Sequence, residues 1–265
     1  MCSAHFALEA FVGRAAIILA GGKGVRMGSP DAKVLVDLGG RSLLAWVLEA
    51  VRSAGVDRIV TVIGYQYERV CARFAEASDV EWVVQEPQRG TGHAVQVTEP
   101  VLGGFDGEVL ILVGDAPLIS SDTLTRLAER QRATGAACTF LTTHVPEPLG
   151  YGRVVRGADG RVSAIVEEKD ATDEQRRIDE ISTSHYCFAA GTLYPTVGRL
   201  TDDNAQGELL LTDCVSLLLG DGRLVETVTA EDYREVVGVN SPGQLAEAKR
   251  LMVALGRVSA GGADE

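Results

Sequence analysis

The chain has 265 residues, 46% of them hydrophobic, which suffices for the core of one large domain and argues against disorder. Thirty-seven acidic and 25 basic residues give a formal net charge of −12, a balance that argues against a general affinity for nucleic acid or anionic membranes. Five cysteines without a C-x-x-C pair indicate neither a zinc site nor a disulfide framework.

The N-terminal stretch MCSAHFALEA lacks the basic region of a secretory signal, and no apolar run approaches the roughly 18 residues of a membrane span. We therefore expect a cytoplasmic protein without a membrane partner. A polyanionic ligand of so acidic a chain must be held by local cations, which makes basic residues in glycine-rich loops informative.

Strands and helices alternate over the first half of the chain. AAIILA (15–20) and RIVTVIG (58–64) are short, β-branched and continuously apolar, as buried strands of a parallel sheet are. Between them, residues 42–55 have apolar positions at helical spacing, an N-terminal serine and a terminal glycine. The same reasoning predicts strands over 80–85 and 108–115 and helices over 67–77, 91–102 and 120–135, the last capped by Ser120, Ser121 or Asp122. This alternation predicts an α/β fold with a Rossmann-like, doubly wound sheet.

The pattern changes after about residue 137. Strands separated by tight turns are predicted over 137–145, 152–170 and 180–191, with GADG as a hairpin turn. We expect these strands to extend the edge of the sheet and to cover a site. Helices are predicted over 208–222 and 241–258, and no linker divides the chain cleanly.

The segment LAGGKGVRMG (19–28) follows the first predicted strand, at the place where open α/β sheets bind their ligands. Gly21, Gly22 and Gly24 allow the backbone to approach a ligand, and their N–H groups can point at phosphate oxygens. Lys23 and Arg26 supply positive charge, so the loop is suited to a triphosphate. The alternative is a glycine-rich turn with solvated cations.

The spacing of this loop excludes two common glycine motifs. A dinucleotide fingerprint that starts at Gly22 needs a glycine where the chain has Met27, and no Gly-Lys-Ser/Thr ends the loop as it does in a P-loop. A dinucleotide-dependent dehydrogenase is disfavoured for the same reason.

LAGGKGVRMG followed by AKVLVDLGGRSLL resembles the L-A-(A/G)-G-x-G-T-R-M … P-K signature of the sugar-phosphate nucleotidyltransferases. The likeness continues in order through QEPQRGTGHAV, LVGDAPLI, GYGRVVR, IVEEKDATDEQ, DNAQGELLLTD and VVGVN. Within this family the chain is similar to the uridyltransferase domain of the bacterial bifunctional enzyme that forms UDP-N-acetylglucosamine. The resemblance covers about residues 15–255.

The resemblance implies the nucleotide-diphospho-sugar transferase fold, a doubly wound mixed sheet with an added β-rich sugar-binding part. Residues 1–265 would form one nucleotidyltransferase domain, with a nucleotide-binding part over about 15–136, a sugar-binding part over about 137–240 and a C-terminal helix over about 241–257. The sequence lacks the hexapeptide repeats of the bifunctional enzyme's second domain. A standalone enzyme and one domain of a longer protein both remain open, as does the oligomeric state.

The resemblance implies a reaction in which a sugar 1-phosphate oxygen attacks the α-phosphorus of a nucleoside triphosphate and expels pyrophosphate. UTP and N-acetylglucosamine 1-phosphate are the favoured partners. Because the sugar phosphate itself attacks, positioning and electrostatics carry the catalysis. Lys23 and Arg26 would bind the leaving pyrophosphate, and Lys33, from the family's P-K pair, would bridge the reacting phosphates. The alternative for Lys33 is a surface lysine.

A magnesium site is expected where Asp115 follows the predicted strand VLILVG, at the carboxyl end of the sheet. Mg²⁺ prefers hard oxygen ligands and takes few of them from the protein, so one carboxylate and one amide oxygen, with phosphates and water, form a sensible shell. The resemblance assigns the amide to Asn240. The alternative for Asn240 is a helix cap ahead of SPGQLAEAK.

The resemblance also assigns the remaining substrate-binding residues. Gln85 would read the uracil edge with Gln88 assisting, since an amide can both donate and accept a hydrogen bond. His93 is expected to be structural, because this chemistry needs no histidine base. The sugar would be bound by Gly152, Glu167 and Ser182. The nucleotide set is completed by Leu19, Ala20, Gly21, Gly22, Lys33, Gly90, Thr91, Val113, Gly114, Asp115 and Asn240.

Three positions depart from the family pattern and bear on the substrate. Val25 replaces a threonine of the loop, and Val113 stands where close relatives can have a polar aromatic residue. STSHY (182–186) replaces an N-T-G pattern, so Ser182 stands in place of an asparagine that contacts the sugar. An enzyme for another sugar or cyclitol phosphate is therefore the alternative within the family. A non-catalytic nucleotide-sugar sensor is the alternative outside it.

Overall fold

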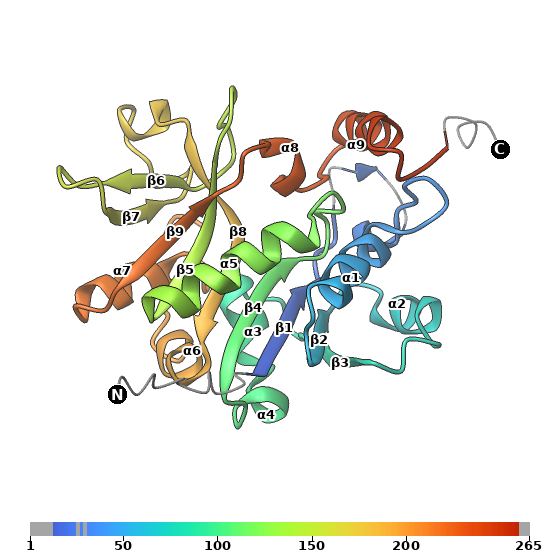
Figure 1. Cartoon of the computed structure of the whole chain (residues 1–265), viewed down its shortest axis with the longest axis horizontal. Helices are drawn as coiled ribbons and strands as arrows, with labels where there is room; N and C mark the ends of the chain where they lie inside the picture. Colours follow the sequence, from blue (N-terminus) through green and yellow to red (C-terminus); the bar gives the residue numbers. More distant parts are fainter. Residues whose placement is uncertain (1–12, 25–26, 29–30, 260–265) are drawn as a thin grey trace, which may run out of the picture.

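The computed structural model describes residues 13–24, 27–28 and 31–259. The main strands of its sheet are β1 (Gly13–Leu19), β2 (Arg58–Ile63), β3 (Val80–Val84), β4 (Gly107–Val113), β5 (Cys138–His144), β8 (Glu180–Ala189) and β9 (Val225–Thr229). They lie in the order β3-β2-β1-β4-β8-β5-β9 within a nine-stranded sheet (Figure 1). The pairings are parallel except those of β8, which runs antiparallel to both β4 and β5. The expected mixed sheet is confirmed.

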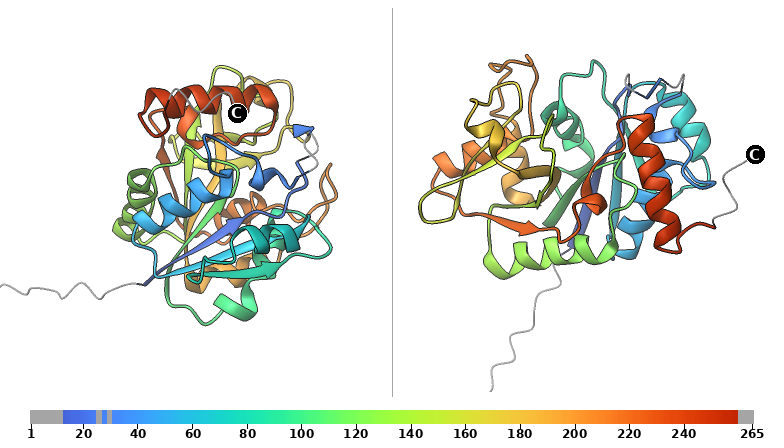
Figure 2. Two further views of the ribbon diagram at one scale, coloured as in Figure 1. Left: turned by 90° about the vertical axis from the view of Figure 1, so that its right-hand side faces the viewer. Right: turned by 90° about the horizontal axis from the view of Figure 1, so that it is seen from above.

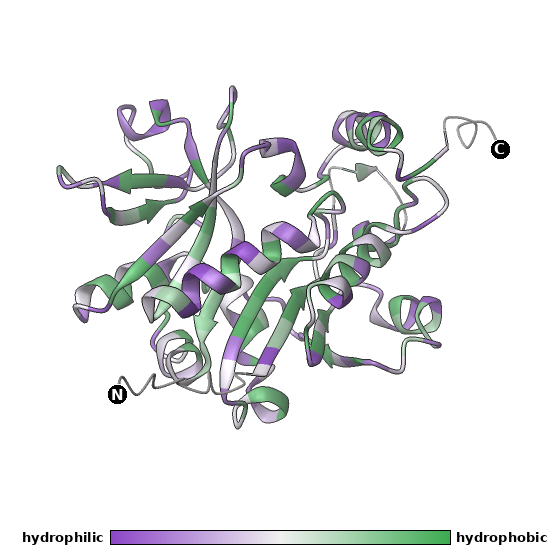
Figure 3. Ribbon diagram, viewed as in Figure 1, coloured by the Kyte–Doolittle hydropathy of each residue, from purple (hydrophilic) through white to green (hydrophobic). Residues whose placement is uncertain are grey.

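Helices cover both faces of this sheet, and the left view of Figure 2 shows the two layers edge-on. Ala16 and Ile18 of β1 belong to the core shared with one layer, whereas Ala15 and Ile17 belong to the core shared with the other. This alternation makes the sheet apolar on both faces, and the central strands are coloured as mostly hydrophobic in Figure 3. The first layer holds α1 (Leu43–Ser53), α2 (Tyr67–Arg73) and α5 (Ser121–Thr134); the second holds α3 (Thr91–Gln96), α4 (Glu99–Leu102), α6 (Ala190–Val197) and α7 (Asp213–Gly220).

The strands after residue 137 extend the sheet beyond β4. β8, however, does not lie at the edge of the sheet, where we expect these strands. It lies between β4 and β5, and its residues are buried almost throughout, so only pairing on both sides satisfies its backbone groups. β6 (Arg153–Arg156) and β7 (Val162–Val166) form the predicted hairpin and join the sheet through a β6–β8 pair. β9 and α6 were not predicted.

Two predicted helices are interrupted or begin late in the structure. The helix expected over 91–102 is divided into α3 and α4 because Pro100, in the first turn of α4, has no N–H to donate to the Gln96 carbonyl. The helix expected over 208–222 begins only at Asp213, because the Leu209 carbonyl accepts from the Gly92 N–H and is not used within a helix.

A third, smaller apolar cluster places the C-terminal helix, α9 (Pro242–Ala254), beside the end of β4. Met252 of α9 and Leu118 belong to the same buried cluster as Trp46 of α1, whose indole N–H donates to the Leu38 carbonyl at 2.9 Å. α8 (Tyr233–Val236) precedes this helix. None of the helices in the described ranges is long and apolar enough to cross a membrane.

β8 buries His185 completely beside Thr183, whose hydroxyl lies 3.1 Å from the His185 Nδ1. Within the described ranges, no group hydrogen-bonds its Nε2. Burial lowers the pKa of His185 to about 4, although the backbone near Thr183 and the charges of Asp115 and Glu235 oppose the shift. The imidazole is therefore neutral at physiological pH.

Truncating a core leucine should destabilise the fold far more than truncating an exposed one. Leu110, at the centre of β4, is fully buried, so Leu110→Ala should lower the free energy of unfolding by about 2–5 kcal/mol. Leu149 is 78% exposed, and Leu149→Ala should change it by less than about 0.5 kcal/mol. Urea unfolding followed by circular dichroism measures both. Equal effects of the two substitutions would contradict the packing described here.

The buried His185 should make stability depend on pH. Its pKa lies below the usual value of about 6.5, so between the two values the unfolded state binds a proton that the folded state does not, and stability falls with falling pH. Between pH 6.5 and 5 the loss should be about 2 kcal/mol in urea unfolding. His185→Gln should remove most of this slope and leave a smaller part that comes from His93, whose pKa is also lowered. His144→Gln, which changes an exposed histidine, should keep the slope. An NMR titration that finds His185 protonating near pH 6.5 would refute the prediction.

Candidate active site

A pocket of about 360 Å³ lies at the carboxyl ends of β1, β3 and β4. The end of β1 and the loops after β3 and β4 converge there because the three parallel strands point to the same edge of the sheet. Most residues assigned to the nucleotide from sequence line this pocket: Leu19, Ala20, Gly21, Gly22, Lys33, Gln85, Gln88, Gly90, Thr91, Val113 and Asp115. Val34, Ala94 and Glu208 complete its wall.

Gly21 and Gly22 of the glycine loop line the pocket with their backbone. A Cβ at Gly22 would meet no atom within 4 Å, whereas a Cβ at Gly21 would lie 3.3 Å from the Gln85 side-chain oxygen. Gly24 has a φ of +66°, and a Cβ there would lie 2.5 Å from the Cβ of Lys33, so only glycine lets Lys33 pack against the loop. Lys23 lies outside the pocket lining, with its ammonium 5.4 Å from the centre of the Tyr65 ring. Arg26 lies outside the described residues.

Lys33 and Asp115 line the pocket, and Asn240, which does not line it, contacts Lys33. The Lys33 ammonium donates to the Asp115 carboxylate and, at 2.9 Å, to the Asn240 side-chain oxygen. Asp115 is only 9% exposed, and its carbonyl accepts from the Val239 N–H at 2.8 Å. A Cβ at Gly238 would lie 3.1 Å from both carboxylate oxygens, so the segment before Asn240 approaches Asp115 closely. One carboxylate and one amide oxygen thus face a common cation.

The structure decides between the alternatives for these residues. Ser241, and not Asn240, is the N-cap of α9, because the Ser241 hydroxyl accepts from the Gln244 N–H. The helix-cap alternative for Asn240 is therefore wrong. The alternative of a solvated surface lysine for Lys33 is also wrong, since the side chain is only 15% exposed.

Part of the pocket wall is built by the loop between β3 and α3. The Gln85 amide nitrogen donates to the Gly90 carbonyl at 2.9 Å and lies 3.2 Å from the His93 Nδ1. Burial, with a smaller contribution from the Arg89 charge, lowers the pKa of His93 and favours a neutral ring that can accept at Nδ1. The Gln88 amide donates to the Gly21 carbonyl and joins this loop to the glycine loop.

Residues 208–211 hold the β3–α3 loop in place. The Leu209 N–H donates to the Arg89 carbonyl at 2.9 Å, and its carbonyl accepts from the Gly92 N–H at 2.7 Å. The Leu211 N–H donates to the Thr91 hydroxyl at 3.0 Å. Gly90 lies between these contacts with a φ of +107°, and a Cβ there would lie 2.5 Å from the Leu209 oxygen. The motif DNAQGELLLTD therefore forms a wall of the site.

A second pocket of about 210 Å³ continues from the first and shares Leu19, Thr91 and Glu208 with it. Glu167 lines this pocket and accepts from the Thr212 hydroxyl at 2.8 Å. Burial raises the pKa of Glu167, and the neighbouring charges of Asp213 and Asp170 add to the shift. The rest of the lining, to which the sequence reasoning gave no role, is Ser184, Tyr186, Gln206, Leu210, Leu211 and Thr212.

Besides Asn240, three of the residues assigned to substrate binding line neither pocket. The Gly114 N–H donates to the Leu19 carbonyl at 2.9 Å and ties β4 to the end of β1. The Gly152 carbonyl accepts from the Ser182 N–H at 2.9 Å, and a Cβ on Gly152 would lie 3.5 Å from the Glu167 carboxylate. The Ser182 side chain is buried, with its hydroxyl 3.4 Å from that of Tyr186.

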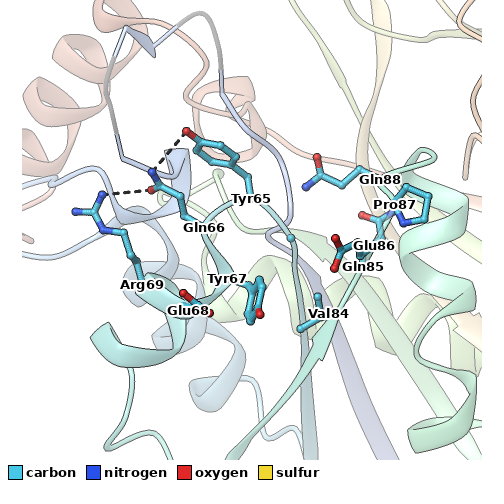
Figure 4. A pocket seen from close by; sticks show the side chains of 11 residues that line it. Tyr65, Gln66, Tyr67, Glu68, Arg69, Val84, Gln85, Glu86, Pro87 and Gln88 are labelled. Carbon is cyan, nitrogen blue, oxygen red and sulfur yellow. Dashed lines mark hydrogen bonds between the residues drawn. The ribbon is translucent and has the colours of Figure 1, made fainter.

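A separate cavity of about 520 Å³ adjoins the first pocket, between the loops after β2 and β3 (Figure 4). It shares Gln85 and Gln88 with the first pocket, and Tyr65 and Tyr67 line it on the other side. Its Arg69 forms an ion pair with Asp31 at 2.6 Å. Lys33 and Asp115 do not line this cavity.

The chain is similar to known proteins over most of its length. The family model described as the MobA-like NTP transferase domain matches residues 16–211. The "Bifunctional protein GlmU" of Geobacter metallireducens is 49% identical over 237 residues, which are 89% of this chain and 50% of that protein. The protein of the same name from Streptomyces coelicolor is 45% identical over 241 residues, 90% of this chain and 50% of that protein. The chain spans about half the length of the curated relatives it matches.

Adding a methyl group at Gly90 should displace the β3–α3 loop. The left-handed backbone and the contact with Leu209 should together lower the free energy of unfolding of Gly90→Ala by at least about 1–3 kcal/mol. Gly104→Ala is the matched control, since a Cβ there would meet no atom within 4 Å. Thermal unfolding of the two variants measures the difference. A Gly90→Ala protein as stable as the control would show that Leu209 does not hold this loop.

Proposed function

The chain belongs to the MobA-like NTP transferase domain family, and we propose that it joins a nucleoside triphosphate to a sugar 1-phosphate and releases pyrophosphate. UTP and N-acetylglucosamine 1-phosphate are the substrates that the sequence motifs favour. The observation that carries the proposal is the contact of Lys33 with Asp115 and Asn240 beside a pocket that a glycine loop borders. These groups suit two phosphorylated ligands and a divalent cation.

The 360 Å³ pocket is the proposed nucleotide site. Gly90 and a neutral His93 both accept from the Gln85 amide nitrogen, which fixes the side-chain orientation and leaves its oxygen to accept a hydrogen bond. Uracil carries a donor at N3 where cytosine carries an acceptor, so this oxygen favours uracil. The open backbone at Gly22 leaves room for the phosphates beside it.

The 210 Å³ pocket is the proposed sugar site. Its carboxylate and hydroxyl side chains suit a ligand rich in hydroxyl groups, with Glu167 as an acceptor. Because the two pockets share Leu19 and Thr91, a sugar phosphate lies next to the nucleotide, and one of its oxygens can attack the α-phosphorus while the bond to pyrophosphate breaks. In this arrangement the nucleotide-binding part is about 15–136 and the sugar-binding part about 137–240, within one domain.

Positive charge at the reacting phosphates comes from a few residues. Lys33 is placed to neutralise the phosphate oxygens, and Lys23 and Arg26 are proposed to bind the leaving pyrophosphate. The donors of Asp115 and Asn240 fit Mg²⁺, because they are hard oxygens that approach one cation. Bound Mg²⁺ would neutralise phosphate charge.

A second candidate is transfer to another sugar or cyclitol phosphate. Ser182 supports it, because its buried hydroxyl does not line the sugar pocket, where the family pattern has an asparagine that contacts the sugar.

Asp115→Asn should keep the fold and lose catalysis. Removing the charge that faces Lys33 should lower Mg²⁺-dependent pyrophosphate release by about 10²–10³-fold, whereas Asp173→Asn, at a 93% exposed side chain, should leave the rate unchanged. The assay is pyrophosphate release with a panel of four nucleoside triphosphates and several sugar 1-phosphates, with UTP expected to be preferred.

Two results of that panel would count against the proposal. If the wild-type protein binds UDP-sugars but releases no pyrophosphate with any pair, the chain is a nucleotide-sugar sensor. If Asp115→Asn retains full Mg²⁺-dependent activity, the metal assignment is wrong.

A further inference from the structure

Ser184 has a backbone conformation that residues with a Cβ rarely adopt. Among the described residues, two that are not glycine have a positive φ, Gln66 at 52° and Ser184 at 61°. The Gln66 side chain is engaged, since its oxygen accepts from the Ala32 N–H at 2.9 Å. In the part of the chain that the structure describes, the Ser184 hydroxyl has no hydrogen-bond partner. The left-handed conformation is costly for serine and free for glycine, so packing within the protein does not account for a serine here.

A bulge in the β5–β8 pair directs this side chain. The register passes from Phe140 opposite Tyr186 to Thr142 opposite Ser182, so residues 183–185 of β8 face Leu141 alone. Residues 183 and 185 are buried, and the Thr183 hydroxyl donates to the Leu141 carbonyl at 3.0 Å. Residues 180–183 and 185–188 are buried. Ser184 is partly exposed, and it lines the 210 Å³ pocket. Bulges of this kind turn a chosen side chain toward a site.

The surroundings of Ser184 are those of a site for a polar ligand. Glu167, Gln206, Glu208 and Thr212 line the same pocket and offer carboxylate, amide and hydroxyl groups. Ser182 does not line it. In the N-T-G pattern of the family that the chain resembles, an asparagine stands at the position of Ser182 and a glycine at the position of Ser184. In this chain the polar group that reaches the pocket comes from residue 184.

We propose that Ser184 determines sugar specificity, its hydroxyl forming a hydrogen bond with a hydroxyl or amide group of the sugar 1-phosphate. The inference rests on the proposed function, because it assigns the 210 Å³ pocket to the sugar. It goes beyond that function because it names a sugar contact, from Ser184, in place of the contact that the family's asparagine makes from the position of Ser182. The cost of the left-handed serine is then offset when the sugar binds.

Two substitutions distinguish the effect of the Ser184 hydroxyl from the effect of its backbone conformation. Ser184→Ala removes the hydroxyl and keeps the Cβ, while Ser184→Gly removes both and relieves the left-handed conformation. Pyrophosphate release is measured with the sugar 1-phosphate that the wild-type protein uses best. In both variants the KM for the sugar phosphate should rise about 5-fold, and kcat and the KM for UTP should stay within about 2-fold of wild type. The Tm of Ser184→Gly should be at least that of Ser184→Ala.

Ser216→Ala, an exposed serine of α7, is the control and should change none of these values. If the wild-type protein is active and Ser184→Ala leaves the KM for the sugar phosphate unchanged, the inference is overturned and the proposed function stands. If the KM values for both substrates rise together with a lower Tm, Ser184 is structural and the inference is also overturned. If the wild-type protein turns over no pair of substrates, the proposed function fails and the inference falls with it.

Discussion

The site is arranged around the hydrogen bonds that the Lys33 ammonium donates to Asp115 and Asn240. The partners of Lys33 lie 82 and 207 residues further along the chain, so these hydrogen bonds form only when β1, β4 and the segment before α9 are all in place. A carboxylate as buried as Asp115 needs a cation beside it, because an unpaired charge of that kind is very costly. Gly24 and Gly238 allow this approach, the first by making room for Lys33 and the second by bringing the chain close to Asp115.

The position of β8 explains why the two pockets adjoin. Because β8 pairs with β4 on one side and β5 on the other, the strand that carries Ser184 lies next to the strand that ends before Asp115. The β6–β7 hairpin joins β8 through the pair of Arg153 and Ile181, and Leu209 ties residues 208–211 to the β3–α3 loop. A β8 at the edge of the sheet would place the 210 Å³ pocket away from the 360 Å³ pocket.

A structural feature can be predicted from the sequence when the residues that determine it are neighbours in the chain. The apolar runs of β1, β2 and β4 depend on their own composition, so both the strands and the doubly wound fold are predictable. The start of α7 and the interior place of β8 depend on partners distant in sequence, such as Arg89 for the N–H of Leu209. Motif resemblance predicts that Asp115 and Asn240 belong to one site, and both contact Lys33 in the structure. A bulge is invisible in composition, so the place of Ser184 in the lining of the 210 Å³ pocket is not predictable. The pyrophosphate-binding role of Lys23 comes from its place in a motif and stays a prediction; its side chain lies over Tyr65.

The charge of the chain explains why so few cations can serve the site. Many arginines are engaged in ion pairs, as Arg52 is with Asp79, Arg58 with Glu81 and Arg156 with Glu180. Such pairs fix side chains at the surface or between strands and leave little positive charge for a ligand. Lys33 is different, because its partners are the oxygens proposed to bind a divalent cation. A lysine can change partners more readily than a bidentate arginine, since its ammonium is a compact charge on a flexible stem. The residue that we propose to neutralise a bound phosphate is thus also the one that compensates Asp115.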